Sequence, residues 1–297
     1  MNRGMLLALS SYLLWGILPI YWKTLTDLPA LETTAHRIVW STLFVAIILL
    51  ARRRWNWLHD IARRPRIAIT FVGTAALILV NWLIYIIAIN TGHIVESSLG
   101  YYMNPLVNVM LAVLFLQERP RFWQWAAIGI AAAGVTYLTI SYGRLPWIAL
   151  GLAFSFAFYG LLKKTARLGA LEGLFIETLI LSIPMAGYLI WREASGVGVF
   201  GHASATTTVV LLLAGIVTAT PLWLFSAGAR EVSLTVLGLL QYIAPTIQFI
   251  LGIALYHEPF AATQMIGFSV IWTALAVFTF EGMAERRRLA LAPAPPH

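Results

Sequence analysis

The chain divides into ten apolar stretches of about 20 residues, separated by short loops. A helix of about 20 residues crosses a hydrocarbon core of roughly 30 Å. Only 11% of the residues are charged and 60% are hydrophobic, which argues strongly against a water-soluble fold. We therefore predict an all-α integral membrane protein with transmembrane helices at 5–24, 31–51, 67–90, 95–116, 122–141, 145–163, 171–191, 207–228, 233–256 and 261–283.

The basic residues predict the orientation of the chain. Sixteen of the twenty Lys and Arg residues fall on the side that carries both termini, three fall on the opposite side, and Arg37 lies inside a span. Cytoplasmic loops collect positive charge, so we expect a multi-pass protein of the cell inner membrane with both termini in the cytoplasm. The first span lacks a small-residue cleavage site and is expected to be retained. The basic residues alternate with apolar spans, so no nucleic-acid partner is expected.

The two halves of the chain share a pattern at an offset of 140 residues. Three residues in or just after the fourth span have counterparts in or just after the ninth. Tyr102, Pro105 and Glu118 match Tyr242, Pro245 and Glu258. Because each half has an odd number of spans, the second half enters the membrane in the opposite orientation. We predict two inverted five-helix repeats, 1–142 and 143–285, followed by a cytoplasmic basic and Pro-rich tail, 286–297. In transporters of this kind the substrate site lies between the repeats near the midplane.

Four segments carry a family resemblance: residues 34–40, 96–108, 151–160 and 241–245. In these segments the chain resembles the EamA-type RarD proteins of the drug/metabolite transporter (DMT) superfamily, and the resemblance extends from about residue 6 to residue 281. It implies a ten-helix inner-membrane protein of two fused five-helix repeats. The family is named for a link to chloramphenicol sensitivity. Its substrate is poorly defined, so the resemblance implies a class of protein rather than a ligand.

Polar residues in the spans predict a central cavity, because polar side chains in a membrane usually face a cavity or another helix. Tyr101, Asn104 and Asn108 share one face of the fourth span. Gln241 and Gln248 occupy corresponding positions in the ninth. The other candidates for the cavity lining are Tyr12, Trp15, Asn81, Trp82, Tyr85, Phe158, Tyr159 and Tyr242. The alternative is that the amides only bond helices to one another.

Three prolines inside spans, Pro105, Pro221 and Pro245, are expected to kink their helices. Each removes a backbone donor and can free a carbonyl oxygen for a ligand. Proline kinks are also common in membrane helices that bind nothing, and this second interpretation stays open.

Arg37 is the most informative residue of the sequence. It lies roughly 10 Å along its helix from the external end, too deep for free solvation, and so needs a carboxylate partner or an anionic substrate. Glu96 is a candidate partner on the same side. Glu177 occupies the repeat position of Arg37 in the cytoplasmic half, and a buried carboxylate there, or at Glu96, would exchange protons. The alternative is a static clamp between Arg37 and a carboxylate.

The remaining ionisable residues favour structural roles. His36 is either a proton sensor or a hydrogen-bonding residue near a helix end. Glu118 and Glu258 are expected to cap helices or fix loops. Lys163 and Lys164 are expected to anchor a helix end at the cytoplasmic interface.

Motifs of other protein classes are missing from the sequence. It has no glycine-rich phosphate cradle, no H-E-x-x-H zinc motif and no G-x-S-x-G elbow. We expect no enzyme, no catalytic residue, no cofactor and no metal. The sequence predicts a secondary active transporter that moves a small organic metabolite or drug-like solute by alternating access, with proton-coupled efflux or exchange as the preferred mode. Its expected partners are the solute, membrane lipid and the proton as a candidate coupling ion. The alternatives are a non-transporting regulatory or structural membrane protein, a facilitative uniporter and a channel; the substrate and the oligomeric state stay open.

Overall fold

A computed structural model describes residues 3–52, 57, 65–90, 94–143, 145–166, 168–255 and 262–291 of the chain. All regular elements in these ranges are helices, as the sequence predicts. In lipid every backbone N–H and C=O must be bonded within the protein, and a helix achieves this within one segment. The helices are α1 (Arg3–Trp22), η1 (Lys23–Leu25), α2 (Ala30–Arg52), α4 (Pro65–Asn90), α5 (Ile94–Leu116), α6 (Phe122–Tyr142), α7 (Trp147–Thr165), α8 (Ala170–Ala194), α9 (Ala205–Glu231), α10 (Leu234–Gln241), α11 (Ile243–Ala254) and α12 (Ala262–Leu291).

Eight helices in the described ranges are long and apolar enough to cross a membrane. Two shorter apolar segments, Ile69–Tyr85 and Leu234–Gln248, complete the set. The predicted ninth span is wrong in one respect: it is not a single helix, because it divides at Tyr242 into α10 and α11, three residues before Pro245. In contrast, α5 continues through Pro105 and α9 through Pro221. At the other end of the sequence α12 continues to Leu291, so the first residues of the expected tail are helical.

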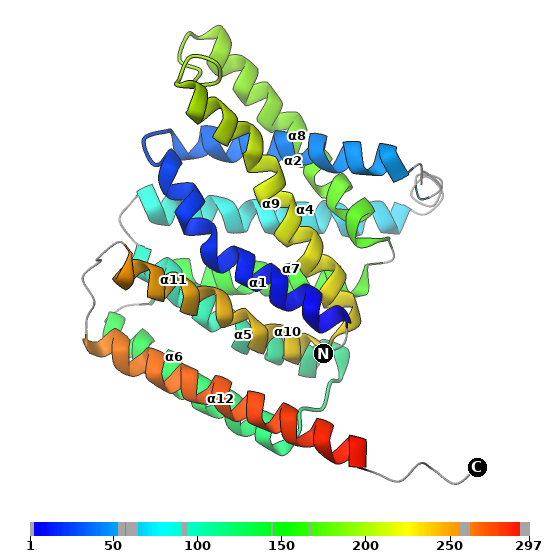
Figure 1. The fold of residues 1–297 in the computed structure, drawn as a ribbon, viewed down its shortest axis with the longest axis vertical. Coiled ribbons are helices and arrows are strands. Elements are labelled where there is room, and N and C mark those ends of the chain that lie inside the picture. The colour runs from blue at the N-terminus through cyan, green and yellow to red at the C-terminus, as the bar shows by residue number, and fades with distance from the viewer. Residues whose placement is uncertain are drawn as a thin grey trace.

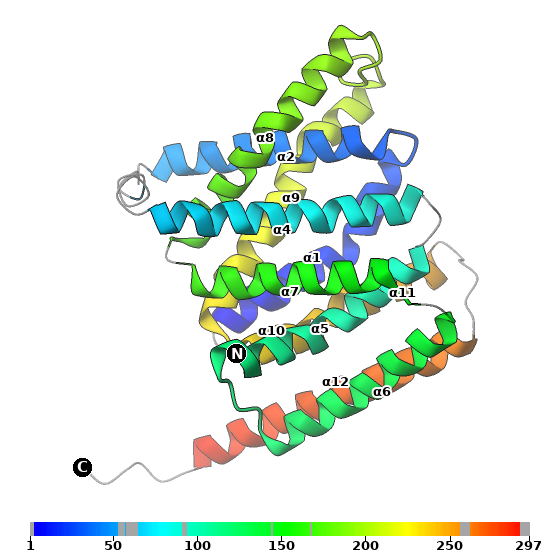
Figure 2. The ribbon, with the colours of Figure 1, turned by 180° about the vertical axis from the view of Figure 1, so that it is seen from behind.

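The helices pack in a layered arrangement with α6 and α12 paired at one edge (Figures 1 and 2). The closest neighbours are α5 with α7, α1 with α9, and α2 with both α8 and α9. Further contacts join α4 to α7 and α8, α1 to α11, and α5 to α10. Large apolar side chains on the outer faces are exposed, such as Leu43 and Ile47 of α2. These faces are suited to contact with lipid tails.

Glycines permit two close helix crossings. A Cβ atom at Gly215 of α9 would collide with the backbone of Trp40 in α2. A Cβ atom at Gly238 of α10 would lie 3.1 Å from the carbonyl oxygen of Pro105 in α5. Small residues at such crossings let two backbones approach, which is a common means of packing membrane helices. The crossings hold α2 against α9 and α5 against α10.

Candidate functional site

Arg37 lies between aromatic side chains of two other helices. Its Cζ atom is 4.8 Å from the ring centroid of Trp22, at the end of α1, and 4.5 Å from that of Trp82 in α4. Both distances lie within the range of a cation–π contact, which stabilises a guanidinium most when water is excluded. Arg37 reaches these rings because α2 begins at Ala30, about two turns earlier, directly after the connection from α1.

Tyrosine side chains complete the surroundings of Arg37. Tyr21, Tyr85 and Tyr101 are its electrostatic neighbours. The rings of Tyr85 and Tyr101 lie 6.0 Å apart in an edge-to-face arrangement and join α4 to α5. The hydroxyl of Tyr21 donates a hydrogen bond to the carbonyl oxygen of Val210 in α9. The guanidinium is therefore enclosed by α1, α4 and α5.

Arg37 has no ion pair with any described carboxylate. Its Nε atom is buried without a hydrogen-bond partner in the described part of the chain. The static clamp expected as an alternative is thus not formed with a described residue. Glu96, the partner suggested by the sequence, has its side chain outside the described residues. The sequence identified Arg37 itself, but it missed Trp22, whose place near a helix end is typical of an interface anchor.

The polar faces predicted for the fourth and ninth spans, here called the polar stripes, contact each other. In α5 the Asn108 side-chain amide donates to Asn104 Oδ1 at 3.0 Å and to Gln241 Oε1 of α10 at 3.2 Å. Asn104 donates in turn to the Ala153 carbonyl oxygen in α7 at 2.6 Å. All three side chains are buried. These contacts support the alternative interpretation, in which the amides bond helices together.

Two further amides predicted for the cavity also bond neighbouring helices. Asn81 of α4 donates to the carbonyl oxygen of Leu152 at 3.1 Å and to Ser155 Oγ at 3.0 Å. Gln248 of α11 donates to the carbonyl oxygen of Trp15 in α1 at 3.0 Å. Each of these five amides therefore bonds to another helix, but the Oδ1 atom of Asn108 is buried without a partner among the described residues, so part of its hydrogen-bonding capacity is unused.

The predicted aromatic lining is a packed cluster. Tyr12, Trp15, Tyr159 and Phe225 lie around Phe156 or one another, with ring centroids between 5.4 and 6.2 Å apart. Tyr12 and Tyr159 are only 1% and 0% exposed. The sequence did not single out Phe156. In this structure the cluster fills the space between α1, α7 and α9.

Two other candidates for the lining lie apart from that cluster. Phe158 contacts the rings of Phe115 and Phe154, both of which are exposed. Tyr242 is fully buried and stacks on Tyr102, with centroids 6.1 Å apart. With Trp82, Tyr85 and Tyr101 near Arg37, the aromatic residues predicted for one cavity are therefore distributed over four places.

Glu177 forms a buried ion pair with Lys163. The Lys163 Nζ atom lies 3.1 Å from Oε1 and 3.2 Å from Oε2 of Glu177, and both side chains are 2% exposed. Tyr159 donates a hydrogen bond to the same carboxylate at 3.2 Å. The expectation that Lys163 is an interface anchor is wrong, because its ammonium turns inward from the end of α7 to a carboxylate on α8. No helical spacing in the sequence links these two residues.

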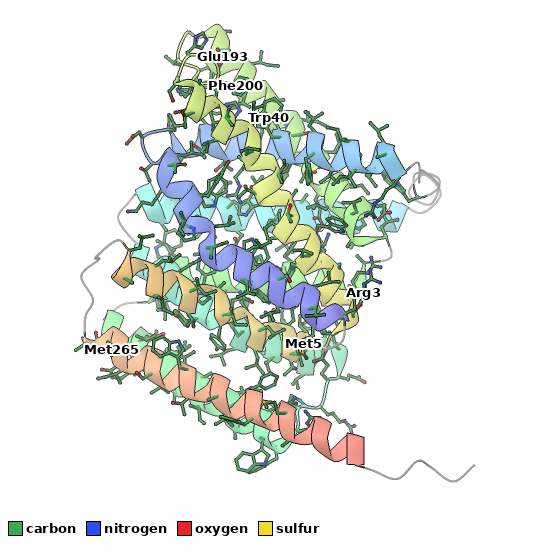
Figure 3. All side chains as sticks on the ribbon, in the orientation of Figure 1. Arg3, Met5, Trp40, Glu193, Phe200 and Met265 are labelled. Atoms are coloured by element: carbon green, nitrogen blue, oxygen red, sulfur yellow. The ribbon has the colours of Figure 1, made fainter. Side chains whose placement is uncertain are left out.

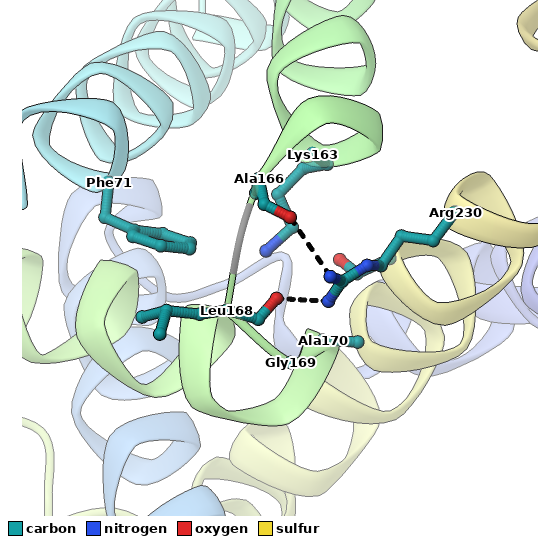
Figure 4. Close-up of a pocket in the computed structure, with 8 residues that line it drawn as sticks. Phe71, Lys163, Ala166, Leu168, Gly169, Ala170 and Arg230 are labelled. Atoms are coloured by element: carbon teal, nitrogen blue, oxygen red, sulfur yellow. Dashed lines mark hydrogen bonds between the residues drawn. The ribbon is translucent and has the colours of Figure 1, made fainter. Parts of the chain in front are cut away.

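Charged side chains also link loops at the end of the molecule where α5, α7 and α9 terminate. This end is here called the basic end. Arg230 donates to the carbonyl oxygens of Ala166, at 3.0 Å, and Leu168, beside Phe71 and Lys163 (Figure 4). Lys164 donates to the carbonyl oxygen of Val232. The basic end is therefore closed by side chains that bond loop carbonyls.

Glu118 adds a tie at the basic end. Its carboxylate accepts hydrogen bonds from the backbone N–H groups of Leu234, at 2.8 Å, and Thr235, at 3.2 Å. These are free donors at the start of α10, and a carboxylate there also interacts favourably with the helix dipole. The capping role expected for Glu118 is confirmed. Its repeat counterpart Glu258 lies outside the described residues.

At the opposite end, Glu32 accepts hydrogen bonds from Arg192 Nη2 and from the backbone N–H of Val199, both at 2.8 Å. His36, one turn further along α2, stacks on Phe200 with centroids 5.2 Å apart. Both of its ring nitrogens are buried without a partner in the described residues.

His36 faces a pocket of about 510 Å³ between α2 and α8. Figure 3 shows Trp40, Glu193 and Phe200 gathered at this place. The lining residues are His36, Val39, Trp40, Leu189, Ile190, Glu193, Ala194 and Phe200. Arg37 is not among them, so the neighbouring residues His36 and Arg37 face different surroundings. Among the residues that the structure describes, no group of three His, Asp or Glu side chains is arranged to hold a metal ion.

Taken together, the long apolar helices and the lipid-facing outer surfaces define a multi-pass α-helical membrane protein. The profile of the EamA-like transporter family matches residues 2–140 and again residues 145–280. The chain belongs to this family, within the DMT superfamily, and its relatives include RarD proteins. Family membership assigns it to the transporters of small-molecule solutes rather than to the enzymes.

Two relatives and one solved structure match nearly the whole chain. Protein RarD of Streptomyces exfoliatus is 44% identical over 297 residues, covering 99% of this chain and 94% of that protein. Protein RarD of Escherichia coli (strain K12) is 42% identical over 287 residues, covering 97% of each. A crystal structure with 19% sequence identity covers 94% of this chain and 98% of its own, with a TM-score of 0.70, and supports the fold alone.

Proposed function

We propose that the protein is a secondary active transporter that moves a small organic solute across the inner membrane by alternating access. The observation that carries this proposal is Arg37: a guanidinium enclosed by aromatic rings, with a buried Nε atom and no described carboxylate partner. A buried charge without a partner is costly, and such groups in membrane helices usually serve a substrate path. In the proposed orientation, the solute reaches Arg37 from the external side.

The proposal includes two inverted repeats, 1–142 and 143–285, with both termini in the cytoplasm. In these repeats α1, α2, α4 and α5 correspond to α7, α8, α9 and the α10–α11 pair. The contact of α5 with α7 then has its counterpart in that of α11 with α1, and the contact of α4 with α7 in that of α9 with α1. The contact of α2 with α9 likewise becomes that of α8 with α4. The packing has the reciprocity that such repeats require, and the two successive family matches agree with it.

The two ends of the molecule differ in a way that suits alternating access. The basic end, cytoplasmic in this orientation, is closed by the Lys163–Glu177 pair and by the loop contacts of Arg230, Lys164 and Glu118. On this proposal the basic end must open for the solute to pass the cytoplasmic side, while the external half closes around Arg37. Glu177 is the proposed coupling residue, because its carboxylate holds the Lys163 ammonium and loss of that contact favours opening.

The test is counterflow in proteoliposomes loaded with a broad panel of metabolites, with each solute followed by mass spectrometry. We expect at least one solute to exchange, and Arg37→Ala to lower its rate at least tenfold, which corresponds to about 1.4 kcal/mol. Arg3→Ala is the matched control, because Arg3 is 82% exposed and lies 3.9 Å from Glu231 at the surface. Folded protein that exchanges no solute would refute the transporter proposal and favour a regulatory or structural role. Exchange without any response to a pH gradient would instead identify a facilitative uniporter.

A further inference from the structure

The charge balance around Arg37 limits the kind of solute that fits there. Its electrostatic neighbours are the uncharged phenols Tyr21, Tyr85 and Tyr101, and no described Lys or Arg accompanies it. One negative charge would neutralise the guanidinium, whereas a second would itself be buried without a partner. An amine would add a like charge, and a neutral solute would leave the guanidinium uncompensated. The surroundings therefore favour a single negative charge.

The hydrogen-bonding groups favour a planar anion. An arginine has five N–H donors in a rigid fork, and the Nε atom of Arg37 is buried without a partner in the described residues. Trp22 and Trp82 offer it ring faces, which leave the in-plane N–H groups available. Two parallel N–H groups match the two oxygens of a carboxylate. Tyr85 and Tyr101, on the neighbouring helices, are electrostatic neighbours of Arg37, and their hydroxyls can also donate to an anion.

The rest of the surroundings is aromatic and apolar. The rings of Trp22 and Trp82 cover the guanidinium, Tyr85 and Tyr101 are its electrostatic neighbours, and Tyr85 also packs against the apolar cluster of Ile148 and Leu152. Such surfaces bind apolar or aromatic bodies through burial and ring contacts. They offer few groups to a strongly polar body such as a sugar.

From the guanidinium without a described carboxylate partner, its Nε donor without a described acceptor and the aromatic side chains near it, we propose that Arg37 recognises singly charged organic carboxylates with an apolar or aromatic body. This inference rests on the proposed transport function, since it names the substrate class of the same site. The carboxylate lies against the Arg37 fork, and the body lies against the indole and phenol rings. Arg37→Lys keeps the charge but loses the two-point geometry.

The experiment measures thermal unfolding of the purified protein in mild detergent with probes that share one body. The four probes share a benzyl group and are compared at a pH above the second ionisation of the phosphonate and below that of the amine. Their charges there are near −1 for phenylacetate, 0 for phenylacetamide, −2 for benzylphosphonate and +1 for phenethylamine. Hexanoate and hexanamide repeat the comparison on an aliphatic body. We expect the two carboxylates to raise the unfolding temperature and the other probes to leave it unchanged. Arg37→Gln should abolish the shift, Arg37→Lys should weaken binding about tenfold, and Arg3→Gln should keep it.

A second measurement uses the wild-type protein, so that it does not depend on the folding of a variant. Phenylglyoxal modifies arginine, and peptide mass spectrometry reports the rate at Arg37. We expect phenylacetate to slow this reaction and phenylacetamide to have no effect. An equal rate with both probes, a carboxylate shift that survives Arg37→Gln, or a larger shift from benzylphosphonate would each overturn the inference.

Counterflow with a mixed set of carboxylates, amides and amines separates this inference from the proposed function. Exchange confined to amides or amines would refute the carboxylate class and leave the transporter in place. Carboxylate binding at Arg37 without exchange of any solute would support the recognition site and refute transport.

Discussion

The carboxylate of Glu177 on α8 and the ammonium of Lys163 on α7 form an ion pair at 3.1 Å, and each side chain is 2% exposed. The Lys163 Nζ atom also lies 5.6 Å from the ring centroid of Phe71 and 5.7 Å from that of Tyr159. Both charges are therefore shielded from water by aromatic rings and by helix. Such a pair stabilises the fold only while both partners are present.

Removing one partner of this pair should destabilise the protein strongly. Glu177→Gln leaves the Lys163 ammonium buried without a counter-charge, at a cost of about 3–5 kcal/mol. The double variant Lys163→Met/Glu177→Leu replaces both charges by apolar groups and should recover most of that loss. Unfolding by denaturant in detergent measures each variant. The control is Arg3→Met/Glu231→Leu, a surface pair, for which we expect a change below about 1 kcal/mol. Equal stability of Glu177→Gln and the wild type would show that removing one partner carries no such cost.

The same double variant tests proton coupling. If Glu177 takes up the proton that drives transport, Lys163→Met/Glu177→Leu should keep solute exchange at equal pH on both sides but lose accumulation driven by a pH gradient. The measurement is solute uptake into proteoliposomes with and without an imposed gradient. Accumulation that matches the wild type would exclude Glu177 as the coupling residue.

Gly215→Ala should disrupt the crossing of α2 and α9. The added methyl group would collide with the backbone of Trp40, which cannot move aside as a flexible side chain can. We expect a loss of about 1–3 kcal/mol, or failure to fold. Gly129→Ala in α6 is the matched control, because nothing lies within 4 Å of its added methyl group. The control should be neutral or slightly stabilising, since alanine favours helix over glycine by up to about 1 kcal/mol. Similar thermal unfolding of both variants would contradict the close approach.

Asn108→Leu separates the two interpretations of the polar stripes. Asn108 bonds both Asn104 and Gln241, so its loss leaves buried polar groups unsatisfied, at about 1–3 kcal/mol. If the amides only join helices, the variant should unfold more easily while the KM for the transported solute stays unchanged. A higher KM with unchanged stability would assign Asn108 to the solute path instead. Thermal unfolding and counterflow on one preparation give both values.

The positions of the helices could be predicted because a run of about 20 apolar residues has few other stable arrangements in lipid. Arg37 could be singled out for a related reason, since a charge inside such a run demands an explanation. The division of the ninth span at Tyr242 was harder to predict. Proline removes a backbone donor, yet α5 continues unbroken through Pro105, so the sequence alone does not say which proline interrupts its helix.

The partners of the site residues could not be predicted, because helical spacing gives the face of a residue but not the helix opposite it. Asn108 and Gln241 were assigned to one cavity, and the structure bonds them directly to each other. Trp22 and Lys163 lie near helix ends, where Trp and Lys usually mark the membrane interface. Only their inward contacts, with Arg37 and Glu177 respectively, separate them from ordinary anchors.

The crossing at Gly238 constrains how this protein can change shape. Without a side chain there, α10 lies directly against Pro105 and Asn108 of α5. Separating α10 from α5 during a conformational change would leave a void between the two backbones. In the alternating access proposed above, α5 and α10 would therefore have to turn about their contact at Gly238 rather than separate.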